Sequence, residues 1–274
     1  MSPESLPYAL LILLVEFTIG GLWVLYFSQS RGQSAASFVK FGAVLTAVMA
    51  VITLWVATEV NVANDVDGYP LDDSYMPEVR WALAAVFALS ALHAVATVSS
   101  HRLPALALGA GASLAGVAAI GFLAQVIAEP AWGLPLVFAS MVIAALVVGA
   151  VSQGMILGHW YLVTPRLPEQ PLREMTGLLL AVIALQLLLL VPALLLPHDD
   201  IKSSVDTEIL SNPFFYLRIG GGIIFPALLG WMAFDSSGAR AMMSATGLLY
   251  IAMALVLAGE VVGRGLMFAS GVPN

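Results

Sequence analysis

The stretch GEVVGRGLMF, residues 259–268, places two opposite charges in an otherwise apolar segment near the end of the chain. Glu260 precedes Arg264 by one helical turn, which is the favourable order for an ion pair at i and i+4. On insertion scales a charged residue at membrane depth costs about 2.5–3.5 kcal/mol, so two together need a reason. The pair either anchors the end of a helix at the membrane surface or lines a site where a membrane-soluble redox molecule exchanges protons.

Glycines surround these charges. Gly259, Gly263 and Gly265 keep the predicted helix thin, so another backbone or a flat ligand can lie close to it. A second run, residues 220–222, follows Arg218 and leaves backbone exposed. Both runs therefore suit either close helix packing or contact with a planar ligand.

The composition is that of a membrane protein. Of the 274 residues, 60% are hydrophobic and 10% are charged, and the mean hydropathy is +0.96. The sequence has no cysteine, which excludes disulfides and iron–sulfur clusters held by this chain, so any such cluster must sit on a partner. The net charge of −7 argues against nucleic-acid binding. No basic residues precede the first apolar run, so we expect a retained span rather than a cleaved signal.

Eight apolar segments each approach the roughly 20 residues that cross a bilayer as a helix. Open strands would leave backbone groups without partners in lipid, so all eight segments should be helices. We predict an all-α, polytopic integral membrane protein with one transmembrane domain over residues 1–274. Its eight-helix bundle is expected at about 8–28, 36–59, 78–99, 104–128, 134–161, 172–196, 214–234 and 241–265.

The basic residues set the predicted orientation. If the helices alternate in direction, one side of the membrane receives most of the Lys and Arg side chains, and this bias marks the cytoplasmic face. Both termini should then lie outside, together with two longer acidic loops at 60–77 and 198–213, which are candidates for docking a partner. The basic residues on the predicted inner side are Arg31, Lys40, Arg102, Arg166, Arg173 and Arg240.

Ionisable residues within the predicted spans form an outer group. Its members are expected near the outer leaflet, where charges of both signs can bind a quinone head group and accept its protons. A structural salt-bridge network is an equally good interpretation. The group comprises Glu16, Tyr216, Arg218, Glu260 and Arg264.

A second, inner group is built around two histidines. His93 and His159 lie on separate helices, each roughly 10–14 Å from the inner surface at 1.5 Å per residue. Two imidazoles at matched depth can ligate a haem b, serve a proton path or an inner quinone site, or be hydrogen-bonded structural residues. Ser90, Ser152 and Tyr161 accompany them, although an aromatic residue at this level is also a common membrane anchor.

The C-terminal residues resemble a known family. GEVVGRGLMF and the preceding LRIGGGIIFPALLG, residues 217–230, are similar to the ending of the NrfD-like membrane-anchor subunits of dimethyl-sulfoxide-reductase and polysulfide-reductase complexes. The resemblance implies eight helices in the prokaryotic cytoplasmic (inner) membrane and quinone chemistry with menaquinone or ubiquinone. It also implies an iron–sulfur partner subunit and a molybdenum-containing catalytic subunit. In such anchors the quinone lies near the outer face, whereas two of the four histidines here lie toward the inner one.

Other functions remain open at this stage. A b-type cytochrome subunit would use His93 and His159 as haem ligands. A proton-coupled transporter is less favoured because paired halves with broken helices are not evident. A purely structural subunit of a respiratory complex is a further alternative. The sequence contains neither H-E-x-x-H nor G-x-S-x-G, which argues against hydrolytic chemistry.

Overall fold

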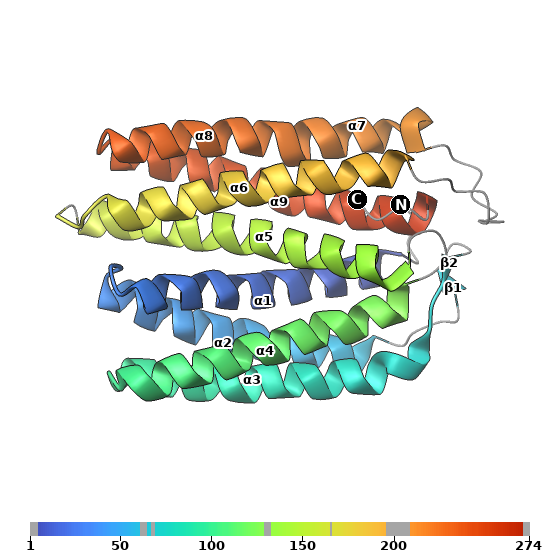
Figure 1. Ribbon diagram of the computed structural model, residues 1–274, viewed down its shortest axis with the longest axis horizontal. Coiled ribbons are helices and arrows are strands. Elements are labelled where there is room, and N and C mark those ends of the chain that lie inside the picture. Colours follow the sequence, from blue (N-terminus) through green and yellow to red (C-terminus); the bar gives the residue numbers. More distant parts are fainter. Residues whose placement is uncertain are drawn as a thin grey trace.

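The computed structural model describes residues 5–60, 65–66, 69–128, 133–164, 166–195 and 209–270. Within these ranges, eight helical spans are long and apolar enough to cross a membrane, as expected of an all-α polytopic membrane protein. They run side by side along the long axis of the bundle (Figure 1). The spans are α1 (Leu6–Arg31), α2 (Ala36–Glu59), α3 (Met76–Val98), α4 (Arg102–Ile127), α5 (Gly133–Val163), α6 (Gln170–Leu195), a composite of α7 (Pro213–Ile219), η3 (Gly220–Ile224) and α8 (Phe225–Gly238), and α9 (Met242–Ser270).

Short elements lie between some of the spans. Two 3-10 turns, η1 (Asp73–Tyr75) and η2 (Ile209–Ser211), precede α3 and α7. A minimal antiparallel ladder joins β1 (Asp65–Val66) to β2 (Tyr69–Pro70) within the first of the predicted acidic loops. Residues 196–208, which include most of the second predicted acidic loop and the predicted end of the sixth helix, lie outside the described residues.

The number and order of the predicted spans are confirmed in the described residues. The end of the last helix differs from the prediction, and this bears on the pair Glu260 and Arg264. The last helix was expected to end near residue 265, but α9 continues to Ser270. Arg264 therefore lies more than one turn inside the helix. Glu260 and Arg264 are fully buried inside the bundle, so they do not form an exposed pair at the end of the helix.

The helices fall into two groups with α1 and α5 between them. Figure 1 shows α2, α3 and α4 on one side of this central pair and α6 to α9 on the other. The backbones of α1 and α5 approach so closely that a Cβ atom on Gly20 would overlap the backbone of Ala145, and one on Gly149 would overlap Gly20. Small residues at the crossing permit this approach, which is how helices pack tightly in lipid.

The seventh span contains a π-helical segment, η3, which ends two residues before Pro226. Proline has no backbone N–H, and its ring collides with the carbonyl four residues earlier in a regular α-helix. The wider π turn relieves this collision: Phe225 donates its backbone N–H to the carbonyl of Gly220, five residues earlier. Such π turns are rare and occur frequently at functional sites.

Candidate functional site

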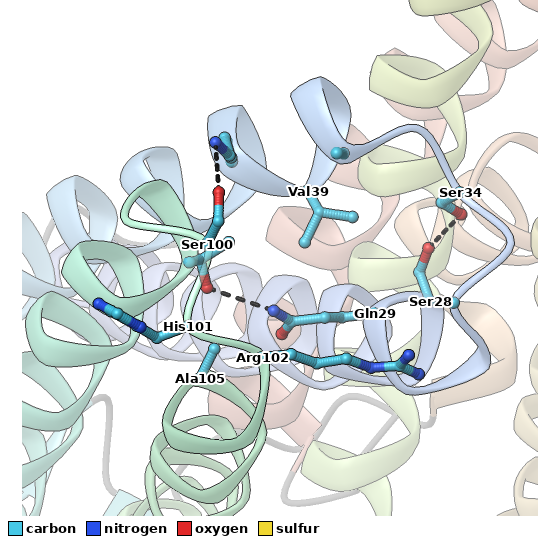
Figure 2. Close-up of a pocket in the computed structure, with 12 residues that line it drawn as sticks. Ser28, Gln29, Ser34, Val39, Ser100, His101, Arg102 and Ala105 are labelled. Carbon is cyan, nitrogen blue, oxygen red and sulfur yellow. Dashed lines mark hydrogen bonds between the residues drawn. The ribbon is translucent and has the colours of Figure 1, made fainter.

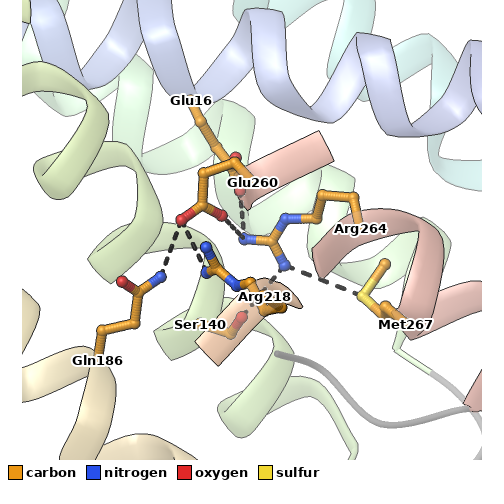
Figure 3. Close-up of polar contacts among 7 residues, drawn as sticks. All are labelled: Glu16, Ser140, Gln186, Arg218, Glu260, Arg264 and Met267. Atoms are coloured by element: carbon orange, nitrogen blue, oxygen red, sulfur yellow. Dashed lines mark hydrogen bonds and ion pairs between the residues drawn. The ribbon is translucent and has the colours of Figure 1, made fainter. Parts of the chain in front are cut away.

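Four charged side chains meet inside the bundle, toward the end where α1 begins and α9 ends (Figures 1 and 3). Glu16 comes from α1, Arg218 from α7, and Glu260 with Arg264 from α9, and all four are fully buried. Arg218 Nη2 donates to Glu260 Oε1 over 2.8 Å, and Arg264 Nη2 donates to Glu16 Oε1 over 2.5 Å. The formal charges of this buried charge network sum to zero, which is the condition under which such groups are tolerated away from water.

The pairing differs from the one expected from sequence. The predicted ion pair between Glu260 and Arg264 along one helix is present, but it is long, at 4.0 Å from Arg264 Nη2 to Glu260 Oε2. Each residue also has a shorter ion pair with a residue on another helix. The network therefore ties α9 to α1 and α7.

Sequence reasoning missed two members of the network. Gln186 on α6 donates its amide to Glu260 Oε1 over 2.9 Å, and Ser140 on α5 accepts from Arg264 Nη1 over 3.2 Å. Gln186 could have been recognised from the sequence, because it is the one polar residue between Leu178 and Val191. An amide placed in such a run requires a hydrogen-bond partner. Ser140 gave no such signal, since a serine can bond to its own helix backbone.

The glycines make room for Arg218 and for the crossing of η3 with α9. A Cβ atom on Gly222 would lie 2.7 Å from Gly259 Cα, so the two backbones are in direct contact. A Cβ on Gly263 would lie 2.9 Å from Arg218 Nε. The space that the sequence suggested for a backbone or a flat ligand is thus occupied by a neighbouring backbone and the Arg218 side chain.

The network retains unused hydrogen-bonding capacity. Among the described residues, Glu16 Oε2 and Glu260 Oε2 accept no hydrogen bond, and Arg218 Nε and Nη1 donate none. Buried polar atoms nearly always have a partner, so such orphaned atoms indicate a water, a proton or a ligand. Gln186 Oε1 and Arg264 Nε are also buried without a hydrogen-bond partner in the described part of the chain.

A small cavity of about 10 Å³ adjoins this network between α6 and the seventh span. Its volume corresponds to about one water molecule. Its polar lining is formed by Ser140, Gln186 and Arg218, and its apolar lining by Leu189, Leu190, Ile219 and Ile223. The cavity therefore brings an apolar wall against the arginine end of the network.

Tyr216 does not join the other members of the predicted outer group. Its side chain is exposed, and its hydroxyl donates to the carbonyl of Leu210 over 2.9 Å. It lies two residues before Arg218, and a separation of two on a helix points the side chains in different directions. The other four residues of the predicted outer group are brought together.

The predicted inner group is not assembled into one site. His93 is fully buried, and its Nε2 lies 2.7 Å from Gln29 Oε1, while the Gln29 amide donates to Thr97 Oγ1 over 3.2 Å. His159 is exposed, and its Nδ1 lies 3.2 Å from the hydroxyl of Tyr250. The two histidines are therefore held by different partners.

Helix packing gives no support to a pairing of these two histidines. Helix α3 packs mainly against α2 and α4, whereas α5 packs mainly against α1, α6 and α9. His93 and His159 were expected at the same depth along the bundle axis, but they lie on helices that pack mainly against different neighbours. Within the described residues, no group of three or more His, Asp or Glu side chains is arranged to hold a metal ion.

The remaining predicted inner residues have local roles. Ser152 donates to the carbonyls of Val148 and Gly149 on its own helix, which is the usual way a serine is satisfied in a membrane span. Tyr161 is buried and donates to the carbonyl of Pro168 over 2.5 Å, which fastens the turn between α5 and α6. Ser90 is buried, and its hydroxyl has no hydrogen-bond partner in the described part of the chain.

Comparison with known proteins identifies no family for this chain. No protein-family model matches it, and a search of curated proteins found no match. The resemblance of the C-terminal residues to reductase anchor subunits thus stays a prediction from sequence, and the function is argued below from the buried charge network.

Proposed function

We propose that this chain is a membrane-anchor subunit of a respiratory oxidoreductase in the prokaryotic cytoplasmic (inner) membrane, where it exchanges electrons and protons with a quinone. The observation that carries this proposal is the buried charge network. Its two carboxylates each have an unpartnered oxygen, and Arg218 and Gln186, which both bind Glu260, line an apolar-walled cavity. The quinone is menaquinone or ubiquinone. An iron–sulfur subunit, docked on the face where α1 begins and α9 ends, exchanges the electrons, and a molybdenum-containing subunit completes the complex.

The chemistry of the cavity suits a quinone head group. A quinone is a flat ring with two oxygens and an apolar tail, so it needs a few hydrogen-bonding groups inside an apolar wall. Arg218 and Gln186 supply the hydrogen-bonding groups, and Leu189 and Ile223 supply apolar contact. The approach would be lateral, from the lipid between α6 and the seventh span.

The cavity is too small to hold a quinone head group as it stands, because pockets that bind small molecules typically have volumes of roughly 300–1,000 Å³. Binding therefore requires α6 and the seventh span to separate beside the network. The segment that must yield is η3, which is π-helical and begins with three glycines. A Cβ atom on Gly220 would meet nothing within 4 Å, so this turn has space on its outer side.

A quinol bound here would become quinone by giving two electrons to the iron–sulfur subunit and two protons to this chain. In this scheme Glu260 accepts a proton at Oε2, the oxygen without a hydrogen-bond partner, while Arg218 stays on Oε1. Glu16 Oε2 is the second acceptor, and Arg264 lies between the two carboxylates.

The test is the turnover of a soluble quinol analogue by the purified complex. Replacing Glu260 with Gln removes the proton acceptor, and loss of a positioned acid–base group typically lowers the rate by about 10²–10⁴-fold. Glu174→Gln, on a surface carboxylate at the other end of the bundle, is the matched control and should leave turnover unchanged. Unchanged turnover in Glu260→Gln, or a purified complex without any iron–sulfur subunit, would refute the proposal.

A purely structural role is the second candidate, and the small cavity favours it. Six side chains from five helical segments satisfy much of one another's hydrogen-bonding capacity, which would lock the bundle. Co-purification of the partner subunits separates the two functions. In the structural case Glu260→Gln lowers turnover only in proportion to the amount of assembled complex, whereas in the redox case the turnover of each assembled complex falls.

A further inference from the structure

A second cavity lies at the opposite end of the bundle, where α1 leads into α2 and α3 turns into α4 (Figures 1 and 2). Its volume is about 250 Å³, much larger than that of the cavity beside the charge network. It lies at the ends of these helices, so in a membrane it would sit at the level of the lipid head groups. None of its lining residues belongs to the buried charge network.

The lining of this pocket is basic. It includes Lys40, His101 and Arg102, and it includes no aspartate or glutamate. Lys40 donates to the hydroxyl of Ser100 over 3.1 Å, a neutral partner that leaves its charge uncompensated. Among the described residues, Arg102 makes neither an ion pair nor a side-chain hydrogen bond; its Nη2 lies 3.3 Å from the position of a Cβ on Gly32. Two cations thus face one cavity with no local counter-charge.

Neutral donors complete the polar half of the pocket. The hydroxyls of Ser28 and Ser34, joined by a hydrogen bond of 2.6 Å, line one side of it, as Figure 2 shows. Ser100 lies on the other side in a left-handed conformation with φ of 63°, which L-residues other than glycine adopt only when the surroundings hold them. The tight turn between α3 and α4 thereby places the hydroxyl of Ser100 next to Lys40.

We infer that this pocket binds the phosphate of an anionic phospholipid head group. Phosphate oxygens accept hydrogen bonds from lysine, from arginine and from hydroxyls, and basic pockets between helices on the cytoplasmic side are known to bind lipid head groups. Arg102 and Lys40 hold the phosphate, and the serine hydroxyls contact its remaining oxygens or the glycerol. This site is independent of the proposed quinone chemistry.

The apolar half of the pocket selects a lipid over free phosphate. Ala36, Val39 and Ala105 form this part of the lining. A free phosphate ion would lose hydration against these side chains without gaining a partner, whereas the glycerol and first acyl carbons of a lipid can pack on them. The end of the bundle also carries the basic residues that mark a cytoplasmic face, the leaflet in which anionic lipids exert their attraction.

Native mass spectrometry of the full chain in detergent micelles tests the site. Phosphatidylglycerol, phosphatidylcholine and inorganic phosphate are titrated separately, and the bound lipid per chain is counted. We expect one phosphatidylglycerol to bind in preference to phosphatidylcholine, and the double variant Lys40→Gln, Arg102→Gln to weaken it by about 30-fold. The matched control is Arg166→Gln, an exposed cation at the same end but outside the pocket, which should bind as the unaltered chain does.

A charge-conserving double variant, Lys40→Arg with Arg102→Lys, guards against misfolding and should retain phosphatidylglycerol. Three results would overturn the site: equal binding of phosphatidylcholine, equal weakening by Arg166→Gln, or displacement of the lipid by millimolar inorganic phosphate. The last result would show a free-anion site in place of a lipid site. These measurements use the chain without its redox partners. Their outcome therefore does not depend on whether the proposed quinone function is correct.

Discussion

The Glu260 carboxylate accepts a 2.8 Å hydrogen bond from Arg218, a residue 42 positions earlier on a different helix. This ion pair, fully buried at both ends, fixes where the seventh span crosses α9. Gly222 and Gly259 are in backbone contact at the same crossing. Charge pairing and close packing thus depend on each other here, and each can be tested by separate substitutions.

Replacing Arg218 alone should strongly destabilise the protein. Arg218→Met keeps a long side chain but leaves Glu260 charged and buried without its partner, which typically costs about 3–5 kcal/mol. The double variant Arg218→Met, Glu260→Gln removes both charges and should recover a large part of that loss. The measurement is the free energy of unfolding in mixed detergent micelles.

The surface ion pair between Arg31 and Glu174 is the matched control for this cycle. Its N–O distance is also 2.8 Å, but half of the Arg31 side chain is exposed. Exposed pairs contribute about 0–1 kcal/mol, so Arg31→Met should have a small effect. If Arg31→Met and Arg218→Met lower the free energy of unfolding by the same amount, burial does not explain the contribution of the internal pair.

A methyl group on Gly222 should disrupt the crossing with α9. Its Cβ would lie 2.7 Å from Gly259 Cα, and backbone cannot move aside as a flexible side chain can. Gly222→Ala should therefore destabilise by about 1–3 kcal/mol, the usual range for overpacking. Thermal unfolding in detergent provides the measurement.

Gly220→Ala is the control for Gly222→Ala, in the same π-helical segment. A Cβ there would meet nothing within 4 Å, and alanine is the better helix former by about 1 kcal/mol. This variant should be neutral or slightly stabilising. Equal destabilisation by both substitutions would show that the segment requires glycine for its backbone conformation and not for the crossing.

Removing the Gln186 amide should weaken the network more than removing a similar amide at the surface. Gln186 donates to buried Glu260 over 2.9 Å, and Gln170 donates to the more exposed Glu174 over 3.0 Å. A hydrogen bond to a charged group contributes about 1.5–3 kcal/mol, so Gln186→Met should cost roughly this amount. Gln170→Met should cost well under half as much, and the reverse order would contradict the geometry.

His93 should resist chemical modification. It is fully buried against Gln29, whereas His101 and His159 are exposed. After partial treatment with diethylpyrocarbonate, mass spectrometry should find His93 modified more than about tenfold more slowly than His101, which corresponds to roughly 1.4 kcal/mol of local opening. Equal labelling of the two would mean that the bundle is open at this end.

Much of the site could be anticipated because ionisable residues in an apolar run are conspicuous. Glu16, Arg218, Glu260 and Arg264 were grouped from depth and charge alone, and the structure brings them together. Tyr216 was grouped with them on depth, but its direction around the helix axis takes it to the surface. Depth follows from counting residues, whereas direction depends on which neighbour each face meets.

The sequence by itself determined the eight spans, their order and the location of the ionisable residues, because hydropathy and the cost of charge in lipid are properties of short segments. Only the tertiary structure decided the partners. Arg264 pairs with Glu16, 248 positions away, more closely than with Glu260 one turn before it, and His93 and His159 share a depth but not a site. The physical reason is that pairing distances depend on the rotation and crossing of packed helices, which is set by contacts such as those between Gly222 and Gly259.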